Sequence, residues 1–178
     1  NRADKELYPQ LNQIAAVGGV VEQGAEARQS GAGSTFRELQ ITGVTAGYAQ
    51  QAANIYPFKA RAASFASDAE VWEALRTRDD VAIVTSDLLA DGEGGRRRFR
   101  ISGVDENSSQ LPEITLDLRT MDGGTVSHRL QVIGLLQDNT TRAGGDIQVN
   151  ITALDKITGQ SVRPSTYYIK VKPGADDQ

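Results

Sequence analysis

The chain has 178 residues, with 19 basic and 23 acidic side chains, a net charge of −4 and no cysteine. A chain of this length buries roughly 70% of its unfolded surface and needs no staple, while the lack of cysteine excludes thiolate metal sites and cysteine catalysis. The weak acidic balance argues against a nucleic-acid partner, and no apolar run approaches the roughly 18 residues of a membrane span.

The start of the sequence carries neither a methionine nor a signal peptide. We therefore expect the sequence to be an excised piece of a longer protein. Its first third mixes helical spacing, strand alternation and Gly-rich stretches. The predicted segments are, in order, a helix at 4–16 ended by Gly18 and Gly19, a candidate strand at 20–28, a loop at 29–34, a strand at 36–44, a helix or an exposed loop at 47–55, and an extended or turn segment at 56–58.

The clearest helix is predicted at residues 67–77. Ser67 and Glu70 have the spacing of a capping box, in which a hydroxyl and a carboxylate bind backbone amides of the first turn. The apolar side chains that should pack on a sheet, with the tryptophan as a core anchor, are Val71, Trp72 and Leu75. The segments that follow are a short buried strand at 81–84, a helical turn at 86–90, a loop at 91–95 and a strand at 99–104.

The strongest structural signal is a hairpin made of residues 113–119 and 125–136. Apolar and polar residues alternate in its first strand, so we expect one face in a core and the other, which includes Asp117, in water. The turn at 122–124 reads Asp-Gly-Gly, which accepts the positive φ of a tight hairpin turn. The second strand becomes mostly apolar at 132–136, which is typical of a strand covered on both faces.

The last quarter of the chain is predicted to contain two more strands. The segments are a loop at 138–145, a half-buried strand at 147–153, a turn at 157–160 and a final strand at 166–171. Together the segments predict an α+β fold with strand-rich mixed sheets and a few packed helices. An all-β sandwich with the helix at 67–77 missing or fully exposed would contradict this prediction.

His128 is the only histidine, so a Ser-His-acid triad would have to use it. It stands within the alternating second strand of the hairpin, and no Gly-x-Ser-x-Gly nucleophile motif occurs in the sequence. A structural role on the strand is the stronger interpretation. With one histidine and no cysteine, a catalytic zinc site would need mostly carboxylate ligands, which is unusual.

Other motifs suggest chemistry but lack a decisive feature. Residues 30–35 miss the Gly-Lys-Ser/Thr ending of a P-loop, and residues 91–94 miss the spacing of a calcium loop. The arginines at 96–98 and 100 are interpreted as an exposed strand edge, with an anionic partner as the lesser alternative. The three Asn-x-Ser/Thr triplets, which arise readily by chance, are at 107–109, 139–141 and 150–152. No residue is assigned to catalysis, to a cofactor or to a metal, and partner-binding residues stay unassigned.

Three segments, in this order, resemble the extracytoplasmic domain of ABC-transporter permeases of the MacB/FtsX type. The first is the capped helix at 68–75 with the strand at 79–84 and the Ser-Asp-Leu-Leu that follows. The second is 129–136, similar to the strand that ends the family's β-rich part. The third is 166–176, a strand followed by Pro-Gly-Ala-Asp. The chain departs from the family in its Gly-rich loops, and it stops where the family adds a further helical segment.

The resemblance implies a non-catalytic domain on the extracytoplasmic side of the bacterial cell membrane, anchored by transmembrane helices outside this sequence. It implies as partners the rest of the permease, a cytoplasmic ATP-binding subunit or domain, and an extracytoplasmic protein, peptide or lipoprotein. No cofactor and no nucleic acid are implied. The expected organisation is one domain over 1–178, within which a β-rich lobe at about 85–136 inserted in a mixed α/β lobe at about 1–84 and 137–178 is an open subdivision.

Two other functions remain as alternatives from the residues alone. Strand-rich composition also suits a secreted carbohydrate- or protein-binding module. Scattered Asp and Glu side chains would suit a hydrolase only if two of them converged in a pocket with opposed pKa shifts. A membrane helix just before residue 1 and three after residue 178 would favour the permease, whereas a secretion signal and a stop codon would favour the secreted module.

Overall fold

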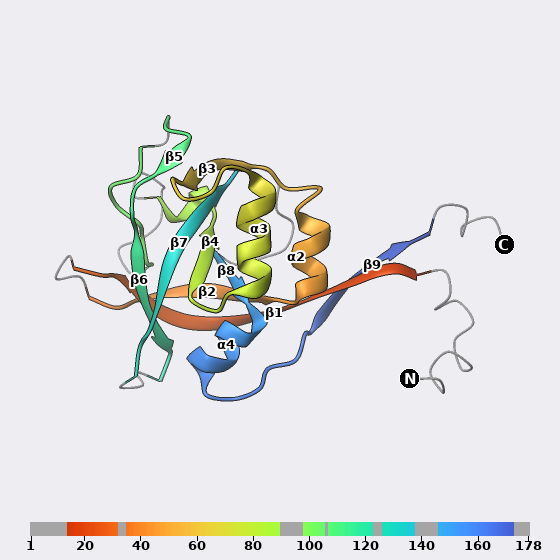
Figure 1. Cartoon of the computed structure of the whole chain (residues 1–178). Helices are drawn as coiled ribbons and strands as arrows, with labels where there is room; N and C mark the ends of the chain where they lie inside the picture. Colours follow the sequence, from red (N-terminus) through yellow and green to blue (C-terminus); the bar gives the residue numbers. More distant parts are fainter. Residues whose placement is uncertain are drawn as a thin grey trace.

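The computed structural model describes residues 14–31, 35–89, 98–105, 107–122, 126–137 and 146–172, and all structural statements refer to these residues. They form strands and helices arranged as a barrel-like body with a projecting ribbon (Figure 1). The elements are, in chain order, β1 (Ile14–Gln29), β2 (Arg37–Val44), α2 (Ala46–Ala52), β3 (Phe58–Ala62), α3 (Asp68–Thr77), β4 (Val81–Val84), η2 (Ser86–Leu88), β5 (Gln110–Leu111), β6 (Thr115–Thr120), β7 (His128–Leu136), β8 (Ile147–Asn150), α4 (Ile151–Thr158) and β9 (Thr166–Val171).

Six of the strands close into a barrel. They follow one another in the order β4-β8-β2-β1-β6-β7, and β7 then pairs with β4 in parallel, from Val81 opposite Gln131 to Val84 opposite Leu135. The β2–β8 pair is also parallel, and the remaining pairs in the ring are antiparallel. Closure gives each of these strands a neighbour on both sides, so the ring has no exposed edge. Strands β3 and β5 extend the sheet outward from β7.

The barrel interior is one apolar cluster to which every strand of the ring contributes alternate residues. This cluster includes side chains that are at most 1% exposed, among them Ile41 of β2, Leu116 and Leu118 of β6 and Leu130 of β7. Helix α4 adds Leu154 to the same cluster and contacts both β2 and β6, so it covers the lower end of the barrel in Figure 1. Alternation along the strands therefore supplies the core, as a period of two requires.

Helices α2 and α3 lie side by side on the outside of the barrel (Figure 1) and bury a second apolar cluster against it. Ser67 caps α3 by accepting a hydrogen bond from the Glu70 amide at 3.3 Å, and the Glu70 carboxylate accepts one from the Ala66 amide at 2.8 Å. Trp72 is 1% exposed, and its Nε1 donates to the Tyr56 carbonyl at 3.1 Å. The predicted capping box, apolar face and core tryptophan of this helix are confirmed.

Strand β1 belongs to both parts of the molecule. Its second half pairs with β2 and β6 inside the ring, whereas residues 14–20 pair with β9 and project from the body as a two-stranded ribbon (Figure 1). The ribbon ends at Ile14 on one strand and at Val171 on the other, which are direct partners. The two ends of the described chain therefore lie together at the tip of the ribbon.

Most predicted elements are confirmed, with shifted bounds. The confirmed elements are the strands predicted at 20–28, 36–44, 81–84, 113–119, 125–136 and 166–171, the helix at 67–77, the helical turn at 86–90 and the α+β class. The ambiguous segment at 47–55 is mostly helix α2. The loops predicted at 91–95 and 138–145 lie outside the described residues, as do most of the turn at 122–124 and residues 32–34 of the loop at 29–34.

Three predictions were wrong. The helix predicted at 4–16 is strand at residues 14–16, because Ile14 and Ala16 pair with β9. Gly18 and Gly19, which were expected to end that helix, continue the strand. Residues 4–13 lie outside the described residues. The strand predicted at 99–104 is reduced to isolated bridges at Arg98 and Ile101. The strand predicted at 147–153 ends at Asn150, whose side chain caps α4.

Two further local features were predicted only in part or wrongly. The segment at 56–58 is extended at its end, as predicted, but the sequence did not show that Phe58 begins strand β3, which pairs with β7. Asp117 was expected in water, but its side chain is only 5% exposed. It is buried because arginines on both neighbouring strands reach across it, as described below.

Candidate functional site

Helix α2 and strand β1 approach each other closely, backbone to backbone, at the base of the ribbon. A Cβ atom on Gly47 would lie 2.2 Å from the Val17 carbonyl oxygen, and one on Gly18 would lie 2.6 Å from the Tyr48 Cα. Both distances are shorter than any real contact, so only glycine allows this approach of helix and strand. Main chain therefore touches main chain here, with no flexible side chain between the two elements.

Thr45, the N-cap of α2, bonds the helix to the same strand. Its Oγ1 accepts hydrogen bonds from the Gly19 amide at 2.8 Å and from the Tyr48 amide at 3.4 Å. Its own amide donates to the Gly19 carbonyl at 2.9 Å. Thr45 thus caps the start of the helix and also fixes it to β1. We call the contact formed by Val17, Gly18, Gly19, Thr45, Gly47 and Tyr48 the α2–β1 joint.

Tyr48 extends the joint to the second strand of the ribbon. Its ring lies 5.5 Å from the ring of Tyr168 on β9, at an interplanar angle of 60°. Tyr48 is 4% exposed, and burial, followed by the nearby Tyr56 and Tyr168, raises the pKa of its hydroxyl above the ordinary value. The ring acts as an apolar wedge, and its hydroxyl stays protonated at any physiological pH.

An open groove of about 750 Å³ lies beside the joint, between the ribbon and the outer side of α2. Among the described residues that line it, the polar side chains are the amides of Gln50, Gln51 and Asn54 and the ammonium group of Lys170. The residues that line it are Ala15, Ala16, Val17, Gly47, Gln50, Gln51, Asn54, Ile55, Ile169 and Lys170.

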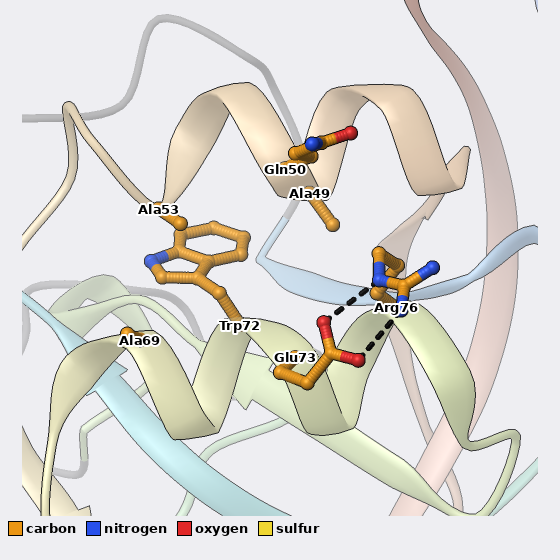
Figure 2. A pocket seen from close by; sticks show the side chains of 7 residues that line it. All are labelled: Ala49, Gln50, Ala53, Ala69, Trp72, Glu73 and Arg76. Atoms are coloured by element: carbon orange, nitrogen blue, oxygen red, sulfur yellow. Dashed lines mark hydrogen bonds and ion pairs between the residues drawn. The ribbon is translucent and has the colours of Figure 1, made fainter.

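A second groove, of about 520 Å³, runs between α2 and α3 (Figure 2). Figure 2 shows the Trp72 indole at one end and the Glu73–Arg76 ion pair at the other, with nitrogen–oxygen distances of 2.8 and 2.6 Å. The hydrogen bond from Arg76 holds the pKa of Glu73 below its usual value. The carboxylate is therefore ionised and occupied, which makes it a poor general acid or base.

A charged ladder crosses β1, β6 and β7 on the outside of the barrel. Asp117 accepts hydrogen bonds from Arg28 Nε and from Arg129 Nε, both at 3.1 Å. Burial raises the pKa of Asp117, but the bonds from Arg129 and Arg28 outweigh it, and the pKa lies below its usual value. Arg119 pairs with Glu26 at 2.7 Å in the same ladder. The two arginines that bond to Asp117 compensate its negative charge, which explains why an aspartate is buried in the middle of a strand.

Among the described residues, those singled out in the sequence lie apart from one another and in contact with the fold. His128 begins β7 directly opposite Leu118 and is half-buried, so its predicted place on the strand is confirmed. Arg100 is bonded to the carbonyl of Leu89 at 3.2 Å and to that of Asp87. Asn150 is 8% exposed and donates to the carbonyls of Leu75 and Arg76, so its triplet serves the fold.

Other predicted residues lie outside the described chain, among them Arg96, Arg97, the acidic residues of 91–95 and the triplet at 139–141. Within the described ranges, no three His, Cys, Asp or Glu side chains gather closely enough to bind a metal ion. None of the described helices is long and apolar enough to cross a membrane.

Comparison with known proteins gives fold similarity without sequence similarity. No protein-family model and no curated protein sequence matches the chain. The extracellular domain of the noncanonic ABC-type transporter YknZ from Gram-positive bacteria aligns over 97% of this chain and 73% of its own length, at 11% identity and a TM-score of 0.52. A domain of a putative permease from Porphyromonas gingivalis aligns over 91% and 58%, at 10% identity and a TM-score of 0.52.

The periplasmic region of MacB from Actinobacillus actinomycetemcomitans aligns over 97% of this chain and 65% of its own length, at 8% identity and a TM-score of 0.51. The chain has a MacB-like periplasmic fold. The fold predicted from three short segments is thus confirmed. The chain spans less than two thirds of the length of two of the three domains, and the identities are too low to carry over a substrate or a binding residue.

Sequence reasoning missed the residues that set this MacB-like fold apart from a plain barrel. Gly18 and Gly19 were noticed but interpreted as the end of a helix, and Gly47 stood in an ambiguous segment. No local pattern shows that Gly18 and Gly47, 29 positions apart in the printed sequence, serve one contact. A pair of glycines inside an apolar stretch is the one available signal, since it marks close backbone approach.

Proposed function

We propose that the chain is a non-catalytic extracytoplasmic domain of a bacterial ABC-type permease, anchored by transmembrane helices outside this sequence. The observation that carries the proposal is the joint presence of the MacB-like fold and of a ribbon at whose tip both described ends meet. A domain held at two adjacent points can be moved as a unit by two membrane helices. The proposed partners are the rest of the permease, a cytoplasmic ATP-binding subunit or domain, and an extracytoplasmic protein, peptide or lipoprotein.

The α2–β1 joint supplies a physical route from the ribbon to the body. A displacement of β1 reaches α2 through main-chain contact at Gly18 and Gly47, where no side-chain rotation can absorb it. Helix α2 contacts α3, which packs on β4 and β8 of the barrel. The ribbon and the helix layer would therefore move together relative to a partner that binds the body.

Location is the first part of the proposal to test, in the intact gene product. The described chain has no native cysteine, so Val126→Cys, at a side chain that is 67% exposed, adds one label site once any cysteines elsewhere are replaced. A membrane-impermeant maleimide should label this site in intact cells, with the protein in the membrane fraction. Labelling only after permeabilisation would contradict the proposal, and release of the protein into the medium would favour the secreted binding module.

Coupling is tested in the full permease in lipid nanodiscs by hydrogen–deuterium exchange. Addition of ATP with a hydrolysis-blocked ATP-binding subunit should change exchange in residues 14–20, α2 and β9. Gly47→Val should abolish the change in α2 while nucleotide binding persists, since the added methyl groups push the helix off the strand. Unchanged exchange throughout the domain would contradict coupling.

The proposal that the domain is non-catalytic includes the expectation that it binds no nucleotide, which can be tested on the isolated chain. Calorimetric titration with ATP should give no saturable heat, because the described chain gathers no phosphate-binding amides at a helix start with a lysine beside them. A micromolar dissociation constant, about −8 kcal/mol, would show that a nucleotide site exists.

A further inference from the structure

The outer strand of the ribbon, β9, has properties that the proposed function does not use. It pairs with β1 on one side, and none of the described strands pairs with its other side. All six of its residues are exposed. An edge strand presents a row of backbone donors and acceptors that another strand can bind.

The side chains of the ribbon separate into two different faces. Tyr168 lies on the face toward α2, because its ring contacts Tyr48. Residues alternate along a strand, so the side chains of Tyr167, Ile169 and Val171 share the other face of β9, and Ile169 and Val17 also contribute to the lining of the groove beside α2. Val17 joins them, since it stands directly opposite Ile169. These four apolar side chains are between 45% and 58% exposed, and we call them the ribbon stripe.

We propose that the ribbon stripe and the free edge of β9 bind a second copy of this chain by antiparallel β9–β9 pairing about a two-fold axis. The edge of β9 that no described strand covers offers backbone donors and acceptors to another strand, whereas a lipid surface has no backbone to pair with them. An antiparallel pair of identical strands is self-complementary, so one patch serves both copies. The stripe then continues across the axis as one apolar surface on a four-stranded sheet.

The register follows from side-chain parity and charge. Residues that face each other across an antiparallel pair point to the same side, so the axis must pass through a residue rather than between two residues if the stripe is to stay on one face. An axis at Lys170 would oppose two like charges, which is destabilising. An axis at Ile169 instead opposes Ile169 to itself and places Lys170 opposite Tyr168 of the second copy, a favourable cation–aromatic pair. Tyr167 then faces Val171 of the second copy.

A strand pair of six residues is a small interface, so the dimer should be weak, with a dissociation constant on the order of 100 µM. Sedimentation velocity over a concentration series should show a monomer–dimer equilibrium. Ile169→Lys, which opposes two charges at the axis, should weaken pairing at least tenfold, and Ile55→Lys, at an exposed apolar residue off the strand, should leave it unchanged. Both variants should unfold at the wild-type urea midpoint, which separates loss of pairing from loss of fold.

Cysteine cross-linking reads the register directly, because the chain has no cysteine of its own. Ile169→Cys should form a disulfide-linked dimer under mild oxidation, far faster than Val126→Cys, an exposed site on the barrel. Tyr167→Cys alone should not cross-link, since two such residues would stand four positions, about 14 Å, apart along the strands. A mixture of Tyr167→Cys and Val171→Cys proteins should give the mixed dimer.

Sedimentation as a monomer at all concentrations, or equal cross-linking at positions 169 and 126, would overturn the proposal. A monomer that co-sediments with phosphatidylglycerol vesicles through the stripe would overturn it in favour of a lipid surface. The inference concerns the isolated chain and does not rest on a place in a permease. A failure of the pairing proposal would therefore not bear on the location and coupling tests above. A failure of those tests would likewise not bear on the pairing proposal.

Discussion

The barrel and the ribbon share strand β1, but the two halves of that strand have different neighbours and different burial. The second half of β1 has neighbours on both sides within a closed ring, and its Ala25 and Ala27 are buried in the interior. The first half has β9 on one side and α2 over one face, and its Val17 is 45% exposed. Stability therefore comes from the barrel, while the ribbon keeps its shape through one strand pair and one helix contact. The difference separates a rigid body from a connector.

The largest expected effect contrasts the two regions by truncation. Leu130→Ala removes a side chain that is 1% exposed inside the barrel and should lower the free energy of unfolding by about 2–5 kcal/mol, through lost transfer energy and the cavity left behind. Ile169→Ala on the ribbon should change it by less than about 0.5 kcal/mol. Urea unfolding of both variants measures the contrast. Equal losses would mean that the ribbon is part of the cooperative core.

The joint between the regions comes next in size. Gly47→Ala places a methyl group against the Val17 carbonyl and should cost about 1–3 kcal/mol, because α2 must move off β1. Gly24→Ala is the matched control, since its Cβ would meet only the flexible Met121 side chain, at 3.3 Å. Urea midpoints report both changes. A Gly47→Ala protein as stable as Gly24→Ala would show that the helix is free to shift.

Asn150 tests how the helices are attached to the barrel, because its side chain bonds the end of strand β8 to both α3 and α4. Its Oδ1 accepts from the Thr152 amide at 2.9 Å, and its Nδ2 donates to the Leu75 and Arg76 carbonyls at 3.1 and 2.7 Å. Asn150→Ala should cost about 1–2 kcal/mol. Asn150→Asp keeps the cap acceptor but loses the donor, so thermal unfolding should place it between Ala and wild type. An Asp variant that melts below Ala would show that carboxylate–carbonyl repulsion outweighs the cap.

The smallest effect is a pH dependence on the outside of the barrel. The folded-state pKa of Asp117 is lowered, so its ion pairs stabilise the fold above the ordinary aspartate pKa of about 3.9 and lose that effect as pH falls through the folded-state value. Wild type should thus exceed Asp117→Asn in stability at pH 7, and the gap should narrow below about pH 4. Urea titrations at both pH values measure it. Asp87→Asn, at an exposed aspartate outside the ladder, is the control, and a gap between wild type and Asp117→Asn that widens in acid would reverse the assigned sign.

Local signals in the sequence were enough to predict those elements whose structure does not depend on a particular distant partner. The capping box of α3 and the apolar run of β7 specify their own structure, and both are confirmed. Ile14 to Ala16 failed because their spacing suits a helix, while a partner strand about 150 residues later decides for β1. Ile151 continues the alternation of β8, yet the Asn150 cap starts a helix there.

The candidate site was less predictable than the fold. Barrel closure depends on the parallel pairing of β4 with β7, and neither strand's own pattern names its partner. Asp117 looked like a solvent-facing residue because alternation reports polarity, whereas its burial depends on Arg28 and Arg129 from two other strands. The joint needs Gly18 and Gly47 at one point in space, which only the three-dimensional arrangement shows.

Native-state hydrogen exchange of the isolated chain tests most directly whether a rigid barrel carries a separately opening ribbon. At protein concentrations well below those at which the chain pairs, amides of β4, β7 and β8 should exchange only through global unfolding and should follow its urea dependence. Amides of β9 and of residues 14–20 should exchange through local opening, faster and with little dependence on urea. Equal protection and equal urea dependence in both regions would contradict the division into body and connector.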